Sequence, residues 1–267
     1  MKLFKKTSSK ISFTSLHNWN VRLAALHAVQ GLLVLILSKA NAWPVSTSYL
    51  TLDTVASKIA GKPVLATASH QVFTVNLAYL VATFFFMSAL AHTIIATKYR
   101  KTYETNLKQG INKARWIEYG FSASVMMVAI ALLSGIYDLS SLLMIFVLDL
   151  LMNLMGLVME IKNQGAKRVD WLPYQLGCLA GIVPWVVFVI YILGTNIYGS
   201  GGVPTFVYFI YGSMFVFFNS FAINMYLQYT KKGKWADYLY GERVYMVLSL
   251  VAKTALAWQV FFGTLRP

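Results

Sequence analysis

A single lysine lies in the last strongly apolar stretch of the chain. Lys253 is the only charged residue among residues 244–262. A lysine near the centre of a membrane span costs several kcal/mol and usually marks a functional group that has a partner. Its amine is a nucleophile, and its most accessible chemistry is a Schiff base with an aldehyde. Lys253 is therefore the strongest candidate for chemistry in this sequence.

The composition places this lysine in a membrane protein. The chain has 267 residues, of which 58% are hydrophobic and only 12% are charged. Seven stretches are long enough to cross a hydrocarbon core of about 30 Å as helices of about 20 residues. We expect an all-α membrane protein, a single seven-transmembrane-helix bundle over residues 1–267. The predicted spans are 21–38, 72–97, 116–136, 139–161, 172–194, 204–229 and 244–264.

Several other classes of protein are disfavoured. The lone Cys178 excludes an intrachain disulfide, and the 4 histidines show no zinc spacing. The basic start is followed by a polar Ser/Thr stretch and a full-length span, so we expect no cleaved signal peptide. No nucleophile, base and orienting group come together, so we do not expect an enzyme.

The net charge is +14, and the basic residues are concentrated in particular loops rather than on one face. Eighteen lysines and arginines lie before the first span, at its mouth, or in the second, fourth and sixth connections, against four on the other side. This bias predicts a cytoplasmic N-terminus and an extracellular C-terminus in the cell membrane. Contact with anionic lipid is the simpler interpretation of the charge, and nucleic acid is not expected as a partner. The N-terminal cations are Lys2, Lys5, Lys6, Lys10 and Arg22.

The first outer connection is unusually long. Residues 39–70 contain Pro44, Gly61 and Pro63 together with the alternating run 46–52. The alternation predicts a short β-hairpin over the outer face. A loop without regular structure fits the same residues equally well.

A buried amine needs a counterion, and depth favours Glu118. Lys253 lies ten residues beyond Arg243, about 15 Å along a helix, and its side chain leans back toward the cytoplasmic turn. Glu118 lies early in the third span and enters from the same side. Opposite charges make each other tolerable in lipid. The sequence does not indicate whether Asp149 faces the interior of the bundle. Glu160 is interpreted as an interfacial residue at a helix end.

Five further polar residues reach a similar depth from the cytoplasmic side. For any one of them, a hydrogen bond to a neighbouring helix is the simpler explanation. Their common depth beside one lysine and one glutamate favours a shared, hydrated network. These residues are His27, Gln30, Ser88, His92 and Ser249.

Aromatic residues, 15% of the chain, are frequent where a long polyene could lie. Ordinary helix packing and interfacial belts explain most of them. The seven spans and the lysine in the seventh span favour the interpretation that some of these aromatic residues form a chromophore pocket. The pocket candidates are Trp116, Tyr119, Met126, Trp185, Phe217, Phe218, Phe221 and Trp258.

Three segments then resemble one known family. Residues 115–119 (RWIEY), 217–229 (FFNSFAINMYLQY) and 249–253 (SLVAK) resemble the third, sixth and seventh helices of heliorhodopsins. The polar positions of the first two spans match as well. The likeness extends over essentially the whole chain and includes the long outer loop and the cytoplasmic N-terminus.

The resemblance implies all-trans retinal on Lys253, Glu118 as its main counterion, and a water-containing cavity beside His27 and His92. It also implies a homodimer. Light-driven pumps typically carry an aspartate one turn before the lysine, whereas this chain has Ser249. The family mostly lacks robust ion pumping, so we expect a light sensor that signals to an unknown cytoplasmic partner.

Two alternatives stay open. A light-driven or light-gated proton or ion transporter needs a polar path through the outer half, and some viral members of the family conduct protons. Asp149, an acid within the fourth span, is consistent with such a transporter. A seven-span scaffold or enzyme without a chromophore is the third hypothesis.

Overall fold

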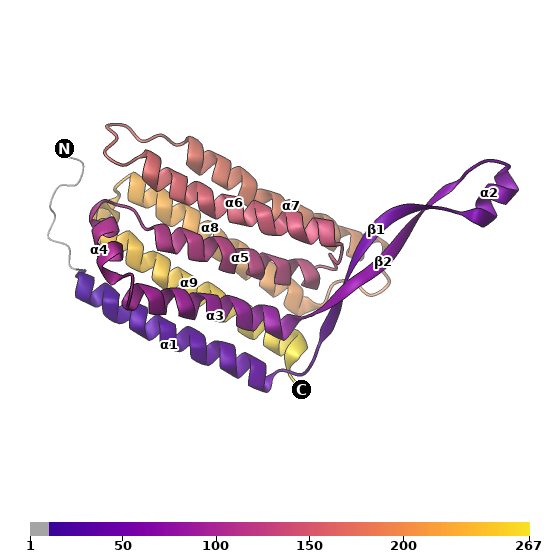
Figure 1. Cartoon of the computed structure of the whole chain (residues 1–267), viewed down its shortest axis with the longest axis horizontal. Coiled ribbons are helices and arrows are strands. Elements are labelled where there is room, and N and C mark those ends of the chain that lie inside the picture. The colour runs from indigo at the N-terminus through magenta and orange to yellow at the C-terminus, as the bar shows by residue number, and fades with distance from the viewer. Residues whose placement is uncertain (1–10) are drawn as a thin grey trace.

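Seven long helices run side by side in the computed structural model, which describes residues 11–267 (Figure 1). Lys2, Lys5, Lys6 and Lys10, which enter the charge argument, lie outside these residues. All seven helices are long and apolar enough to cross a membrane, so the predicted seven-helix fold is confirmed. They are α1 (Phe13–Leu37), α3 (Leu77–Ala96), α5 (Lys113–Leu133), α6 (Leu139–Lys162), α7 (Leu172–Tyr198), α8 (Thr205–Tyr229) and α9 (Tyr238–Val260), the last continued by a π-turn at Phe261–Leu265.

Two helices begin well before their predicted spans because polar caps lie outside the apolar stretch. The Ser12 hydroxyl accepts a hydrogen bond from the Ser15 amide, and α1 therefore starts at Phe13 instead of residue 21. The Asp237 carboxylate caps α9 at the Leu239 amide, so that helix starts at Tyr238 instead of residue 244. Hydropathy marks the apolar part of a helix, whereas capping side chains mark its end.

The long first connection forms a β-hairpin, and the unstructured alternative is wrong. Strands β1 (Ala42–Leu52) and β2 (Leu65–Asn76) pair antiparallel and flank a short helix, α2 (Thr54–Ala60). Residues 72–76, predicted as membrane helix, belong to β2. Residues 72–75 are β-branched or aromatic, which suits a strand, and Asn76 caps α3 immediately afterwards.

The base of the hairpin is fixed to the bundle while its tip projects away (Figure 1). The Ser46 amide donates to the Tyr137 carbonyl at 2.9 Å, between α5 and α6. The Trp43 ring packs on the Tyr137 ring with centroids 5.7 Å apart. The Lys39 amide donates to the Leu265 carbonyl at 2.8 Å. We call this side of the bundle the hairpin end.

The opposite side carries a helix that the sequence did not lead us to expect. Helix α4 (Arg100–Lys108) lies between α3 and α5, and its Tyr103 and Leu107 are buried against the start of α1. We call this side the α4 end. The first residues of α1 lie there, whereas the C-terminus lies at the hairpin end (Figure 1).

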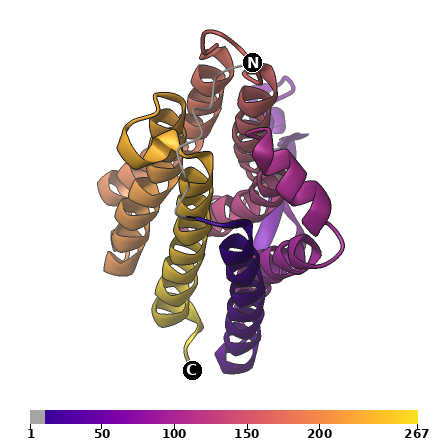
Figure 2. The same ribbon diagram turned by 90° about the vertical axis from the view of Figure 1, so that its left-hand side faces the viewer.

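The packing order of the helices sets which side chains meet inside. Helix α3 packs between α1 and α5, α6 packs between α5 and α7, and α9 packs against α8 and α1. Figure 2 shows this arrangement from the α4 end. The large apolar core fills mainly the hairpin half, while most buried charges lie nearer the α4 end.

Candidate functional site

Lys253 lies inside the bundle with two polar partners. Its side chain is 3% exposed. The amine donates to Glu118 Oε1 at 3.1 Å and to Ser249 Oγ at 2.8 Å. Ser249 is one helical turn before Lys253 on α9, whereas Glu118 comes from α5. A buried ammonium paired with a buried carboxylate avoids the large cost of either charge alone.

Glu118 is held by a second helix as well. The Ser88 hydroxyl of α3 donates to Glu118 Oε1 at 2.5 Å. The Tyr119 ring lies beside the same lysine, with Nζ 5.2 Å from the ring centroid. Three helices, α3, α5 and α9, therefore fix the position of one ion pair.

The two histidines form a stack next to this group. The rings of His27 and His92 are nearly parallel, at 7°, with centroids 5.7 Å apart. Nδ1 of His92 lies 2.7 Å from Asn20 Oδ1, so this nitrogen carries the hydrogen. Both nitrogens of His27 are buried without a hydrogen-bond partner among residues 11–267.

Gln30 belongs to a different contact. Its side-chain oxygen accepts from the Trp258 indole at 3.3 Å. The structure therefore brings together Ser88, Glu118, Ser249 and Lys253, places the histidine pair next to them, and leaves Gln30 out of the group.

A cavity begins at Lys253 and continues between the helices. Its volume, including the part open to the outside, is about 400 Å³, and it adjoins a second, partly open space of about 730 Å³ that reaches α7. Met152, Asn153, Phe218 and Phe221 line both spaces. Apolar walls with a few polar groups are typical of a site for a small hydrophobic ligand.

Most of the predicted pocket residues lie on these walls, and two do not. Tyr119 and Met126 line the space at Lys253, and Trp116 and Trp185 line the adjoining one. Phe218 and Phe221 belong to both. Phe217 and Trp258 line neither space and pack against the apolar core of the hairpin half.

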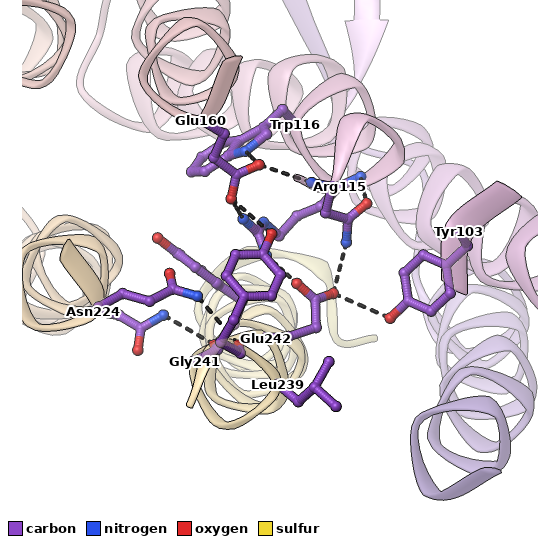
Figure 3. A network of polar contacts seen from close by, with 12 residues as sticks. Tyr103, Arg115, Trp116, Glu160, Asn224, Leu239, Gly241 and Glu242 are labelled. Atoms are coloured by element: carbon purple, nitrogen blue, oxygen red, sulfur yellow. Dashed lines mark hydrogen bonds and ion pairs between the residues drawn. The ribbon is translucent and has the colours of Figure 1, made fainter. Parts of the chain in front are cut away.

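A second buried charge cluster, which was not predicted from the sequence, lies near the α4 end. The guanidinium of Arg115 bridges two carboxylates, donating to Glu160 Oε1 at 2.5 Å and to Glu242 Oε2 (Figure 3). All three side chains are at most 3% exposed. The guanidinium also lies over the Tyr245 ring, 4.0 Å from its centroid.

Neutral donors complete the cluster around both acids. Glu160 accepts from the Asn112 amide at 2.8 Å, the Trp116 indole at 2.7 Å and the Tyr238 hydroxyl at 2.9 Å. Glu242 accepts from the Asn112 side chain at 2.6 Å and from the Tyr103 hydroxyl at 3.2 Å. Tyr103 thus ties α4 to α9, as Figure 3 shows.

Arg115 was counted among the cations of the second connection, Glu160 was interpreted as an interfacial residue, and Glu242 fell outside the predicted seventh span. One signal was available. Glu242 is followed directly by Arg243, but Tyr240 before it and Tyr245 after it are aromatic, and an acid that enters a bundle among such residues needs a cation on a neighbouring helix.

A seven-helix membrane bundle with a buried lysine–carboxylate pair beside an apolar cavity defines a membrane protein of the rhodopsin class. The chain belongs to the heliorhodopsin family, whose family model matches residues 16–265. No individual curated protein matches the sequence. Membership in this family makes the chain a rhodopsin-like membrane photoreceptor, and rhodopsins carry retinal.

Proposed function

We propose that this protein is a light sensor that carries all-trans retinal on Lys253 and uses Glu118 as the counterion. One observation carries the proposal: the Lys253 amine lies 3.1 Å from Glu118 Oε1 and lines the cavity. When bound through a Schiff base, retinal supplies absorption of visible light and isomerisation.

The residues around the cavity fit such a chromophore. Tyr119, Met126, Phe218 and Phe221 offer apolar and aromatic surface on the walls near Lys253. Aromatic faces and methionine side chains suit a conjugated chain and adapt to its shape.

The polar residues offer a place for a proton. Glu118 Oε1 is the carboxylate oxygen that accepts from the Lys253 nitrogen, and the Ser88 hydroxyl stabilises its charge. We propose His92 and His27 as the next groups on this route. Buried polar atoms are usually hydrogen-bonded, so we expect ordered water at the ring nitrogens of His27.

The α4 end is proposed to face the cytoplasm of a cell membrane. Its exposed cations include Lys98, Lys101, Lys108, Lys167 and Lys232, as the positive-inside rule requires. The N-terminus would then be cytoplasmic and the C-terminus extracellular. A homodimer and an unidentified cytoplasmic partner belong to this proposal.

Sensing is favoured over pumping because the polar partners of Lys253 form one local group. The hairpin half is packed mainly with apolar side chains, among them Phe84, Ile130 and Leu256. A transporter is the second candidate, since Asp149 is buried at 1% exposure in the middle of α6.

The test is the spectrum of purified protein with added all-trans retinal. We expect a visible absorption band that is lost in Lys253→Ala and kept in Lys98→Ala, a matched change at an exposed lysine. Protein that stays colourless would contradict a retinal photoreceptor. A light-induced current in a voltage-clamped cell that disappears in Lys253→Ala would contradict sensing without transport.

A further inference from the structure

A stripe of polar and small residues runs along α6 and packs against α5. Asp149, Asn153, Gly156 and Glu160 recur at intervals of four, three and four residues, so they lie on one helix face. Each meets α5. At the α4 end the Trp116 indole bonds Glu160, and a Cβ on Gly156 would overlap the Trp116 ring.

The middle of the stripe reaches the retinal cavity. Asn153 lines both of the adjoining spaces. Its side-chain amide lies 3.3 Å from Asp149 Oδ2, and it also donates to the Asp149 carbonyl at 2.9 Å. Asp149 is therefore one hydrogen bond behind the cavity wall.

The hydrogen bonds at Asp149 fit a carboxyl group that carries a hydrogen. The Ser124 hydroxyl has one hydrogen, and its near acceptor is the Gly120 carbonyl at 2.6 Å. Ser124 Oγ also lies 3.3 Å from Asp149 Oδ2. With the hydroxyl hydrogen directed at Gly120, a hydrogen bond to Asp149 requires the acid to be the donor.

No cation stands close enough to hold Asp149 as a carboxylate. Among residues 11–267, none forms an ion pair with it, because Lys253 pairs with Glu118 and Arg115 with Glu160 and Glu242. An unpaired carboxylate in the middle of a membrane span costs several kcal/mol, whereas the protonated acid is neutral.

The neighbouring elements offer no other charge. Helix α7 and strand β1 contain no Lys, Arg, His, Asp or Glu, and their remaining titratable side chains are tyrosines and Cys178. On α5, the charged residues Lys113, Arg115 and Glu118 all lie at least six residues before Ser124.

We propose that Asp149 is protonated at neutral pH and, with Asn153, forms a polar contact that reports retinal geometry to α6. The idea rests on the proposed photoreceptor function. A change in the cavity that displaces the Asn153 amide weakens its hydrogen bond to Asp149. The α6 face then carries the displacement to Glu160, eleven residues further along the helix.

The first test needs no retinal. The retinal-free protein is labelled with ¹³C at the aspartate side-chain carboxyls, and labelled-minus-unlabelled infrared spectra are recorded at pH 7. We expect one isotope-shifted carbonyl band of a protonated acid, lost in Asp149→Asn. Asp138→Asn, the same change at the cap of α6, should keep it. Absence of the band, or its survival in Asp149→Asn, overturns the proposal.

The second test uses the retinal-loaded protein in light-minus-dark infrared spectra. We expect the labelled band to shift on illumination in wild type, and Asn153→Ala to keep the band in the dark but to reduce its light-induced shift. A band that does not respond to light in the coloured wild-type protein overturns the reporting role. Failure to form any coloured protein contradicts the photoreceptor function instead, so the two failures are distinguishable.

Discussion

Arg115 and Glu118 lie one turn apart on α5 but belong to different charge groups. Glu118 pairs with Lys253 of α9, and Arg115 bridges Glu160 of α6 and Glu242 of α9. A single helical turn thus connects the proposed chromophore site to a cluster that joins α4, α5, α6 and α9. A movement of α5 or α9 at Lys253 must change both groups.

The first prediction concerns the counterion. Glu118→Gln removes the negative charge 3.1 Å from the Lys253 nitrogen. The positive charge on the proposed linkage between retinal and Lys253 then loses the carboxylate that stabilises it in the dark. We therefore expect a strong red shift of the visible absorption band or loss of the proton from this linkage. Absorption spectra across pH measure this effect. Glu104→Gln, at a surface pair with Arg100, is the matched control, and an unshifted Glu118→Gln spectrum would move the counterion role elsewhere.

The second prediction concerns the stability of the buried cluster. Arg115→Ala leaves two carboxylates buried without a cation, which costs roughly 3–5 kcal/mol of unfolding free energy. Arg100→Ala breaks only a partly exposed pair and should cost about 0–1 kcal/mol. Thermal unfolding of the purified variants compares the two. Equal midpoints would show that the bridged carboxylates do not depend on Arg115.

Hydropathy was sufficient to predict the seven helices, whereas alternation offered the hairpin only as one of two equal alternatives. The signals are local: each span is one continuous apolar stretch, and the run 46–52 alternates. The helix ends were less accurate because caps such as Ser12 and Asp237 lie in polar sequence. Helix α4 was missed because its few buried residues, Tyr103 and Leu107, provide little apolar pattern.

The candidate site was predictable where one residue had a clear energetic problem. An isolated lysine demands an acid, and depth along two helices was enough to choose Glu118. The cluster at Arg115 was not predicted because its three charged members lie near helix ends, where sequence alone does not distinguish a solvated charge from a buried one. That distinction depends on α4 and its Tyr103 covering the cluster.

The third prediction concerns alkaline pH. Burial, and after it the negative charge of Glu242, raise the pKa of Tyr103 well above its usual value. The unfolded chain loses this proton at about pH 10 while the folded protein keeps it. The contribution of the protonated Tyr103 hydroxyl to the free energy of unfolding is therefore complete below that pH. This contribution is lost as the pH rises above it.

The difference in thermal stability between wild type and Tyr103→Phe should accordingly narrow from about pH 9 to pH 11. Tyr198→Phe, at a residue that is 87% exposed, should show no such narrowing. A stability difference between wild type and Tyr103→Phe that stays constant over this range would show that the Tyr103 hydroxyl ionises alike in the folded and unfolded states.

The fourth prediction concerns the contact between α5 and α6. A Cβ on Gly156 would overlap the Trp116 ring, and Trp116 also donates to Glu160 at 2.7 Å. Gly156→Ala must therefore move the indole, and overpacking of this kind costs roughly 1–3 kcal/mol. Gly212→Ala on α8 meets nothing within 4 Å and should be neutral or stabilising by up to about 1 kcal/mol, because alanine favours a helix. Thermal unfolding measures both variants.

Trp116 also lines the adjoining cavity, so only Gly156→Ala should shift the visible band of the retinal-loaded protein. Matching spectra and matching unfolding midpoints for the two variants would contradict a tight contact between α5 and α6.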